Sequence, residues 1–338
     1  MGKTKQGKSL NTLSTLSQKT KKSNQKTKRS KDQKTEDIPK DIETLDTELD
    51  QLKAQALLEN EEAMKLSKES FNLITKAIDD SDIIFQILDG RDPYGCRLTE
   101  IEQRIKDKGK TLINIINKCD LIPTDVAIRW LGDQSLTDSS DKLIGISSNS
   151  EEIESASKLL SEMLETIPNL NHQSKISIIG IKKVGKSSLL NILKDIGFEN
   201  LHEISSYEFL MPTSSASLLN AVDIWEDLSE FTLEFLSRCQ DESIFDVIGI
   251  EPCEDVDEVM TQYSKVIKKT LRQTTKEFAN KLLDGSLPFF SIPDDTPLQT
   301  ISDSQKAVLD SLEAKGKDFD THIHIVKGDP LEINPEIL

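Results

Sequence analysis

Apolar residues are concentrated in four short runs in the middle of the chain, each bounded by polar or turn residues. The runs are "DIIFQIL", "TLINII", "KLIGI" and "KISII", at residues 82–88, 111–116, 142–146 and 175–179. Runs of this length and composition are typical of buried strands. Segments of helical length lie between them, at residues 98–108, 124–133 and 151–166. The alternation predicts an α/β fold in which helices flank a parallel sheet.

The regions on either side of this middle part follow other patterns. Residues 1–40 hold almost nothing to bury, which predicts disorder because the entropy of ordering is not offset. After them, apolar residues three or four apart predict a helix to about Ser70, which either docks on a folded surface or forms a short coiled coil. The stripe comprises Ile42, Leu45, Leu49, Leu52 and Ala56.

Four regions are therefore expected along the chain. They are a disordered basic arm at 1–40, a helix at 41–70, an α/β domain at 71–217 and a mostly helical domain at 218–338. Since ligands of open parallel sheets bind beyond the carboxyl ends of the strands, the chemistry is expected where the four apolar runs end.

The net charge of -17 conceals two oppositely charged parts. Residues 1–35 carry eleven Lys or Arg and one Asp, so the rest of the chain has 31 basic and 58 acidic residues. The arm is suited to RNA phosphates or to a nuclear address, although a solubilising tail is the alternative. The acidic C-terminal region favours docking on basic proteins. No DNA or membrane partner is predicted.

The cysteines indicate neither a disulfide framework nor a zinc site. Cys96, Cys119, Cys239 and Cys253 have no CxxC pairing and no His at metal-ligand spacing. The sequence contains no apolar run of the length that crosses a membrane, and its first residues lack the apolar core of a secretory signal. We expect a soluble intracellular protein.

The fourth apolar run leads into a phosphate-loop pattern, "GIKKVGKSS". Glycines allow backbone N–H groups to close around phosphate oxygens, Lys186 can reach the outer phosphates, and Ser187 can hold Mg²⁺. The predicted phosphate-binding residues are Gly180, Lys182, Lys183, Val184, Gly185, Lys186, Ser187 and Ser188.

Two other strand ends carry candidates for reading guanine. In "INKCDLIP", Asp120 can accept two hydrogen bonds from guanine, Lys118 can lie along the base, and Asn117 can tie this loop to the phosphate loop. In "GISSNS", a backbone N–H of Ser147 or Ser148 can meet the guanine carbonyl oxygen. Taken alone, the first segment could be a solvated turn and the second an ordinary polar loop. Guanosine di- or triphosphate is the predicted ligand.

The order of these motifs is reversed relative to ordinary GTPases, since Asn117 precedes Gly180 by 63 residues. With "AIDDSDIIFQILDGRDPYGCR", "INKCDLIP" and "ISIIGIKKVGKSSLLNILK" in this order, the chain resembles the circularly permuted GTPases, and among them the nucleostemin-like nucleolar family. The resemblance extends more loosely to "LLDGSLPFFSIPDD" and "IHIVKGDPLE". It implies a circularly permuted P-loop GTPase fold and a nucleolar protein in large ribosomal subunit assembly.

The resemblance also covers an Asp-Ala-Arg-Asp-Pro-type signature, with Gly90 where Ala is usual. Its members here are Asp89, Arg91, Asp92, Pro93, Gly95 and Arg97. We expect these charges to pair with one another at the sheet edge, and assign them no catalytic role.

The chain departs from the family after the phosphate loop. Between Ser188 and Val222 there is no D-x-x-G and no Pro-Gly-Thr-Thr-like segment. The missing Asp would help to position Mg²⁺, and the missing Gly N–H would sense the outer phosphate. Asp92 to Gly95 and Asp246 to Gly249 spell D-x-x-G, but neither lies in the expected place.

Three hypotheses follow for the activity. The first is a guanine-nucleotide-binding assembly factor with weak or absent hydrolysis. The second is an active switch whose metal-linked carboxylate is displaced, for example to Glu203 or Glu208. The third is a pseudo-GTPase scaffold that binds no nucleotide. Intact phosphate and guanine motifs favour the first.

Overall fold

The computed structural model describes residues 41–136, 142–149, 151–204, 210, 228–240, 242–253, 255–294, 301–314 and 322–337. The predictions for the basic arm at 1–40 and for Glu208 lie outside these residues. The chain divides into two compact units, Met1–Glu69 and Ser70–Leu338. Within the described part, none of the helices combines the length and the apolar character that crossing a membrane requires.

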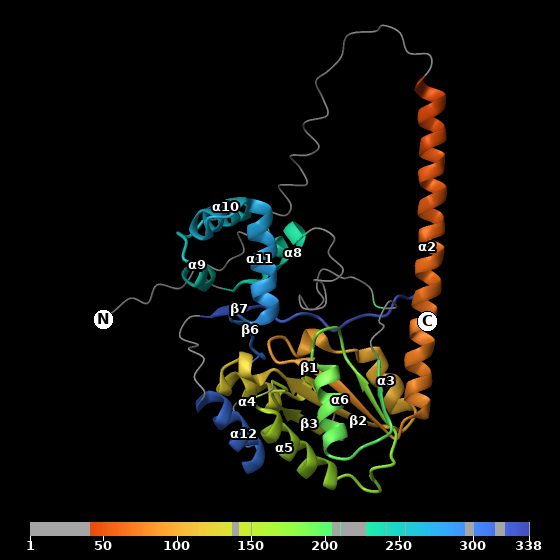
Figure 1. Cartoon of the computed structure of the whole chain (residues 1–338), viewed down its shortest axis with the longest axis vertical. Coiled ribbons are helices and arrows are strands. Elements are labelled where there is room, and N and C mark those ends of the chain that lie inside the picture. Colours follow the sequence, from red (N-terminus) through yellow and green to blue (C-terminus); the bar gives the residue numbers. More distant parts are fainter. Residues whose placement is uncertain are drawn as a thin grey trace, which may run out of the picture. The chain divides into compact units, whose positions relative to one another are not determined.

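The second unit is built on a sheet flanked by helices (Figure 1). Its five strands lie in the order β3-β2-β1-β4-β5. Four of its strands are the predicted ones: β1 (Ile83–Asp89), β2 (Thr111–Asn117), β3 (Lys142–Gly145) and β4 (Ile176–Ile179). Every neighbouring pair is parallel. The predicted α/β class with a parallel sheet is therefore confirmed.

The fifth strand, β5 (Leu201–Glu203), was not predicted. Its three residues pair with β4, placing it at the edge next to the strand that leads into the phosphate loop. With the sequence "LHE" and only one apolar residue, it lacks the length and alternation by which a strand is recognised in sequence.

The predicted helices occupy the connections between strands. They are α3 (Thr99–Asp107), α4 (Thr124–Gly132) and α5 (Ile153–Glu165), and α6 (Lys186–Asp195) follows the phosphate loop. The central strand β1 is buried over all seven residues, as expected for a parallel strand covered on both faces. The buried amide of Gln86 in this strand donates to the Glu102 carboxylate at 2.7 Å, which satisfies a polar group inside the core.

Helix α2 (Asp41–Asp80) is longer than the sequence pattern indicated. The prediction ended the helix near Ser70, but Phe71, Ile74 and Ile78 continue the three-to-four spacing, and all three are buried. Their burial in the second unit explains why the last turns remain helical.

The C-terminal part is mostly helical, as predicted. It contains α8 (Leu228–Arg238), α9 (Ser243–Ile248), α10 (Val256–Ile267), α11 (Leu271–Asp284) and α12 (Asp303–Ala314). Two short strands, β6 (Phe289–Ser291) and β7 (Ile323–Ile325), pair in parallel and were not predicted.

Helix α12 lies beside α4 and α5 (Figure 1) and protects the β3 edge of the sheet. The Gln305 side chain donates to the Gly145 carbonyl at 2.7 Å and accepts from the Gly145 N–H at 2.9 Å. This side chain therefore satisfies backbone groups that an edge strand leaves unpaired.

Candidate functional site

The phosphate-loop pattern forms a tight turn between β4 and α6. Gly180 and Gly185 have φ values of 139° and 104°, in the region that only glycine adopts without strain. A Cβ on Gly185 would lie 2.1 Å from the Asn117 amide nitrogen, and a Cβ on Gly180 would lie 2.6 Å from the Ile87 carbonyl oxygen. Both glycines are thus required by conformation and by space.

Lys186 places a cationic group inside this turn. Its ammonium donates to the carbonyl oxygens of Gly180 at 2.9 Å and Ile181 at 2.8 Å. Burial lowers the pKa of Lys186 to about 8, against the opposing effect of the Glu203 carboxylate. Of the other predicted loop residues, Lys182, Lys183 and Ser187 are exposed, Ser188 is partly exposed and Val184 is buried.

Asn117, at the end of β2, connects three strand-end loops. Its amide nitrogen donates to the Val184 carbonyl at 2.7 Å and to the Ser148 hydroxyl at 2.9 Å. Its amide oxygen accepts from the Ser148 backbone N–H at 2.9 Å. The three segments singled out in sequence therefore meet at one edge of the sheet, and the predicted tie from Asn117 to the phosphate loop is present.

The neighbouring guanine-reader candidates are held by polar contacts of their own. The Ser147 hydroxyl donates to Asp120 Oδ1 at 2.7 Å, which leaves acceptor capacity on the carboxylate. Lys118 has a left-handed backbone with φ of 62°, and its ammonium lies 2.8 Å from Asp89 Oδ2.

Asp89 belongs to the Asp-Ala-Arg-Asp-Pro-type signature and is completely buried with Arg91. The Arg91 guanidinium donates to both carboxylate oxygens of Asp89, at 2.9 Å each, and to the backbone carbonyl of Leu282 in α11. Burial alone would raise the pKa of Asp89, but the charges of Arg91 and Lys118 outweigh it and hold the pKa well below its usual range. The predicted pairing within the signature is thus observed, and it also fastens α11 to the sheet.

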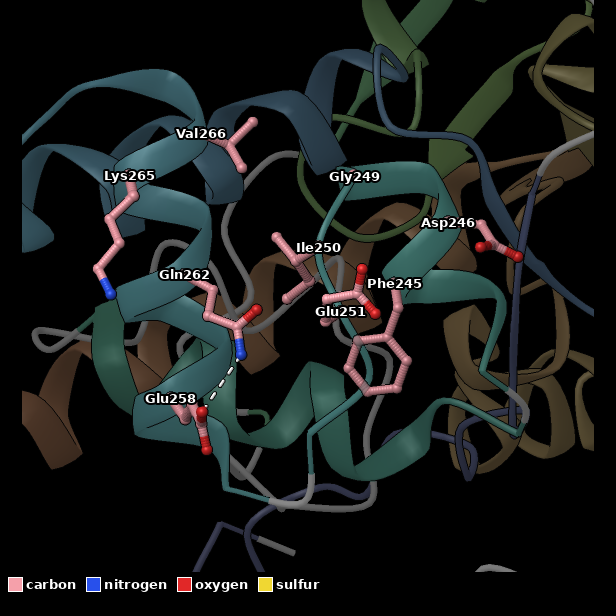
Figure 2. A pocket seen from close by; sticks show the side chains of 9 residues that line it. All are labelled: Phe245, Asp246, Gly249, Ile250, Glu251, Glu258, Gln262, Lys265 and Val266. Carbon is pink, nitrogen blue, oxygen red and sulfur yellow. Dashed lines mark hydrogen bonds between the residues drawn. The ribbon is translucent and has the colours of Figure 1, made fainter.

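The two D-x-x-G look-alikes lie among residues outside the phosphate loop. Asp92 is buried and accepts a hydrogen bond from the Gly328 N–H at 3.1 Å, so it joins the C-terminal segment to the sheet. Asp246 and Gly249 lie on α9 and at its end, where they line an open cavity of about 590 Å³ with residues of α10 (Figure 2). No residue of the phosphate loop lines that cavity.

Glu203, which the sequence offered only as a possible displaced metal-linked carboxylate, lies beside the phosphate loop. The Ser187 hydroxyl donates to Glu203 Oε1 at 3.0 Å, which brings the carboxylate beside the predicted metal ligand. A carboxylate at the end of the strand next to the phosphate-loop strand is the signal that could have found it, but β5 was itself not recognised.

Several known proteins are similar to this chain over part of its length. No protein-family model matches it. It is 38% identical over 130 residues to the nucleolar GTP-binding protein 2 of Yarrowia lipolytica, and the match covers 38% of this chain and 25% of the relative. It is 27% identical over 281 residues to the nuclear/nucleolar GTPase 2 of Oryza sativa subsp. japonica, covering 71% and 52% respectively. The chain is thus similar to proteins named as nuclear and nucleolar GTP-binding proteins.

Two further matches are a protein of known sequence and a solved structure. The chain is 35% identical over 126 residues to a GTP-binding protein of Methanocaldococcus jannaschii, and the match covers 36% of this chain and 31% of that protein. A structure described as GDP-bound TM YlqF covers 67% of this chain and all of that chain, at 16% identity and a TM-score of 0.49. The chain spans between a quarter and about half of the length of its curated relatives.

These relatives confirm the resemblance predicted from the motifs. Their nuclear and nucleolar names agree with the location that the resemblance implied. In this chain the strand ends that carry the motifs converge although Asn117 precedes the phosphate loop in the sequence.

Proposed function

We propose that the chain binds guanine nucleotides at the edge where β2, β3 and β4 end. The observation that carries the proposal is the position of Asn117, which joins the phosphate loop to both guanine-reader segments. A nucleotide needs its phosphates and its base held at the same time, and this arrangement presents both sets of groups on one continuous edge. The relatives named as GTP-binding proteins support the same ligand.

Each predicted residue has a definite role in this proposal. Backbone N–H groups from Lys182 to Ser188, together with Lys186, hold the phosphates. Asp120 accepts hydrogen bonds from guanine, and Lys118, held by Asp89, lies along the base. Ser147 and Ser148 shape the loop around the guanine carbonyl oxygen.

A magnesium ion fits the remaining groups. The Ser187 hydroxyl and the Glu203 carboxylate lie together at the start of α6, and Mg²⁺ prefers oxygen ligands in combination with substrate phosphates. Mg²⁺ bound there would neutralise charge on the outer phosphates. Ser187 is the residue assigned to hold it.

Hydrolysis in this proposal is weak or absent. Phosphoryl transfer depends on positioning and charge stabilisation, and the sequence between Ser188 and Val222 lacks the Asp and Gly of a D-x-x-G switch. Without the Gly N–H that senses the outer phosphate, the protein makes nearly the same contacts with GTP and with GDP. The affinities for the two nucleotides should therefore be similar. The Ser187–Glu203 contact favours the metal part of the displaced-carboxylate alternative, but it does not supply a phosphate sensor.

The cellular setting follows from the resemblance and the charge distribution. We propose a nuclear and nucleolar factor in large ribosomal subunit biogenesis. The basic arm would contact ribosomal RNA, and the acidic C-terminal region would dock on basic proteins of pre-ribosomal particles. Between Glu203 and Met260 there are fifteen acidic residues and one basic residue, Arg238, which disfavours RNA contact there.

The deciding experiment titrates the protein with fluorescent GTP, GDP and ATP analogues and measures single-turnover phosphate release on the same preparation. Lys186→Ala serves as the blank. The proposal expects guanine-selective binding, similar affinities for GTP and GDP, and little release. Absence of nucleotide binding would favour the scaffold hypothesis, and Lys186-dependent hydrolysis at ordinary GTPase rates would restore the active switch.

A further inference from the structure

Strand β5 brings a carboxylate to the phosphate loop without any recognisable switch motif. After α6 ends at Asp195, the chain enters β5 at Leu201 and runs parallel to β4, with Glu203 opposite Ile178. Parallel strands end at the same edge of a sheet, so Glu203 is carried to the edge from which the phosphate loop departs.

The backbone on both sides of Glu203 is fixed to β4. The Ile204 N–H donates to the Ile178 carbonyl at 3.0 Å, and the Ile176 N–H donates to the Asn200 carbonyl at 2.9 Å. Strand pairing therefore sets the backbone position from which the Glu203 side chain extends.

The Glu203 carboxylate interacts with two side chains of the phosphate loop, Ser187 and Lys186. The Ser187 hydroxyl donates its hydrogen to Glu203 Oε1 at 3.0 Å. Burial lowers the pKa of Lys186, and the negative charge of Glu203 opposes that decrease. A hydroxyl that donates its one hydrogen keeps two oxygen lone pairs as acceptors. The lone pairs of Ser187 are thus directed away from Glu203 and remain available to a cation.

We propose that Glu203 is the positioning residue of a Mg²⁺ site at Ser187, in place of the switch Asp that the sequence lacks. This inference rests on the proposed nucleotide binding, because phosphate oxygens complete the site. Glu203 orients the Ser187 hydroxyl and contributes negative charge that favours a divalent cation. The chain accordingly retains Mg²⁺-assisted nucleotide binding after losing the switch.

The test compares Glu203→Gln with the wild-type chain in fluorescent GDP titrations, once with Mg²⁺ and once with excess EDTA. Glu199→Gln, an exposed residue just before β5, is the matched control, and thermal unfolding checks that each variant is folded. In wild type, Mg²⁺ should tighten GDP binding. In Glu203→Gln, this enhancement should fall by about 10–100-fold, the usual effect of losing a group that orients a metal ligand.

The EDTA measurement separates a metal role from a structural one. Without metal, removal of a carboxylate beside the phosphates should leave GDP affinity unchanged or increase it, because charge repulsion is relieved. Titration of the GDP complex with Mn²⁺, followed by electron paramagnetic resonance, should show weaker Mn²⁺ binding in Glu203→Gln than in wild type or Glu199→Gln. Equal Mg²⁺ enhancement in variant and wild type, or an equal loss of affinity with Mg²⁺ and with EDTA, would overturn the inference alone. Failure of the wild type to bind GDP in either buffer would overturn the proposed function as well.

Discussion

The side-chain amide of Asn117 donates a hydrogen bond to the backbone carbonyl of Val184 at 2.7 Å, across 67 positions of the sequence. Between their strands lies β1, which pairs with β2 on one side and β4 on the other. Parallel pairing brings the carboxyl ends of all three strands to one edge, whatever their order in the chain. The permuted motif order therefore leaves the geometry of the edge intact.

Asn117→Ala should loosen this edge. The substitution removes the hydrogen bonds to Val184 and Ser148 and leaves a buried carbonyl unpaired, so the free energy of unfolding should fall by about 1–3 kcal/mol. GTP and GDP affinities should fall together, since both the base loop and the phosphate loop lose a support. Urea denaturation and nucleotide titration measure the two effects. Asn191→Ala, at an exposed position on α6, is the control and should change neither.

Gly185→Ala should be more damaging than an ordinary glycine substitution. The added Cβ would come within 2.1 Å of the Asn117 amide nitrogen, at a φ of 104°. Gly109→Ala is a matched control, because Gly109 also has positive φ, at 63°, but no neighbouring atom within 4 Å. Left-handed backbone strain costs about 1–2 kcal/mol.

Urea denaturation should therefore show a larger loss of stability for Gly185→Ala than for Gly109→Ala, and only the former should lose nucleotide binding. Equal losses would mean that the phosphate loop yields easily and that its contact with Asn117 is not essential.

Asp120→Asn tests the guanine assignment. The carboxylate can accept two hydrogen bonds from guanine, and bonds to a charged group contribute about 1.5–3 kcal/mol each. GTP affinity should drop at least tenfold, while the unfolding midpoint changes little because Asp120 is partly exposed. The amide can donate to the second carbonyl of xanthine, so xanthosine nucleotides should bind the variant better than the parent. Unchanged GTP affinity would remove Asp120 from the site.

The sequence predicted the parts of the fold that have long, regular signals. Four strands and the helices between them were recognisable because burial on both faces demands continuous apolar runs. Strand β5 was not recognisable, because it has three residues and gains its place only by pairing with β4. Strands β6 and β7 are equally short. The last turns of α2 are stabilised by the burial of Ile74 and Ile78, which is a tertiary contact that the local pattern does not specify.

The same distinction applies to the site. The motifs identified Asn117, Lys186 and Ser187, because each belongs to a short segment whose residue spacing is set by the group that it is predicted to bind. The Ser187–Glu203 contact depends on two strands lying side by side, and no spacing rule encodes it. The attachment of Arg91 to the Leu282 carbonyl likewise joins positions that are far apart in sequence.

Residues 1–35 should direct nucleolar accumulation. They hold eleven basic residues and one acidic residue, on a chain whose remainder is strongly acidic. Fluorescently tagged protein in which these basic residues are replaced by Gln should spread through the cell, because the positive charge proposed to contact RNA phosphates is removed at constant length. Retained nucleolar signal in this variant would place the targeting determinant elsewhere in the chain.

Asp92 should make the stability of the fold depend on pH. Burial raises the pKa of this carboxyl to about 6 from its ordinary value of 3.8, despite hydrogen bonds from Gly328, Gly95 and Ser291 and the charge of Arg238. A carboxyl whose pKa is higher when folded stabilises the protein fully below about pH 4 and loses that contribution as pH rises through about 6. At 1.36 kcal/mol per pKa unit, the loss is about 3 kcal/mol.

Asp92→Asn isolates this contribution. The amide oxygen can still accept from Gly328, but the side chain no longer ionises, so the variant should lack the loss between pH 4 and 6. The difference in unfolding free energy between Asp92→Asn and wild type should therefore shift in favour of the variant as pH rises from 4 to 7. All other titrating groups are common to both proteins and cancel in this difference. A difference that stays constant over the range would show that the buried carboxyl does not titrate there, and that the hydrogen bonds from Gly328 and Gly95 outweigh its burial.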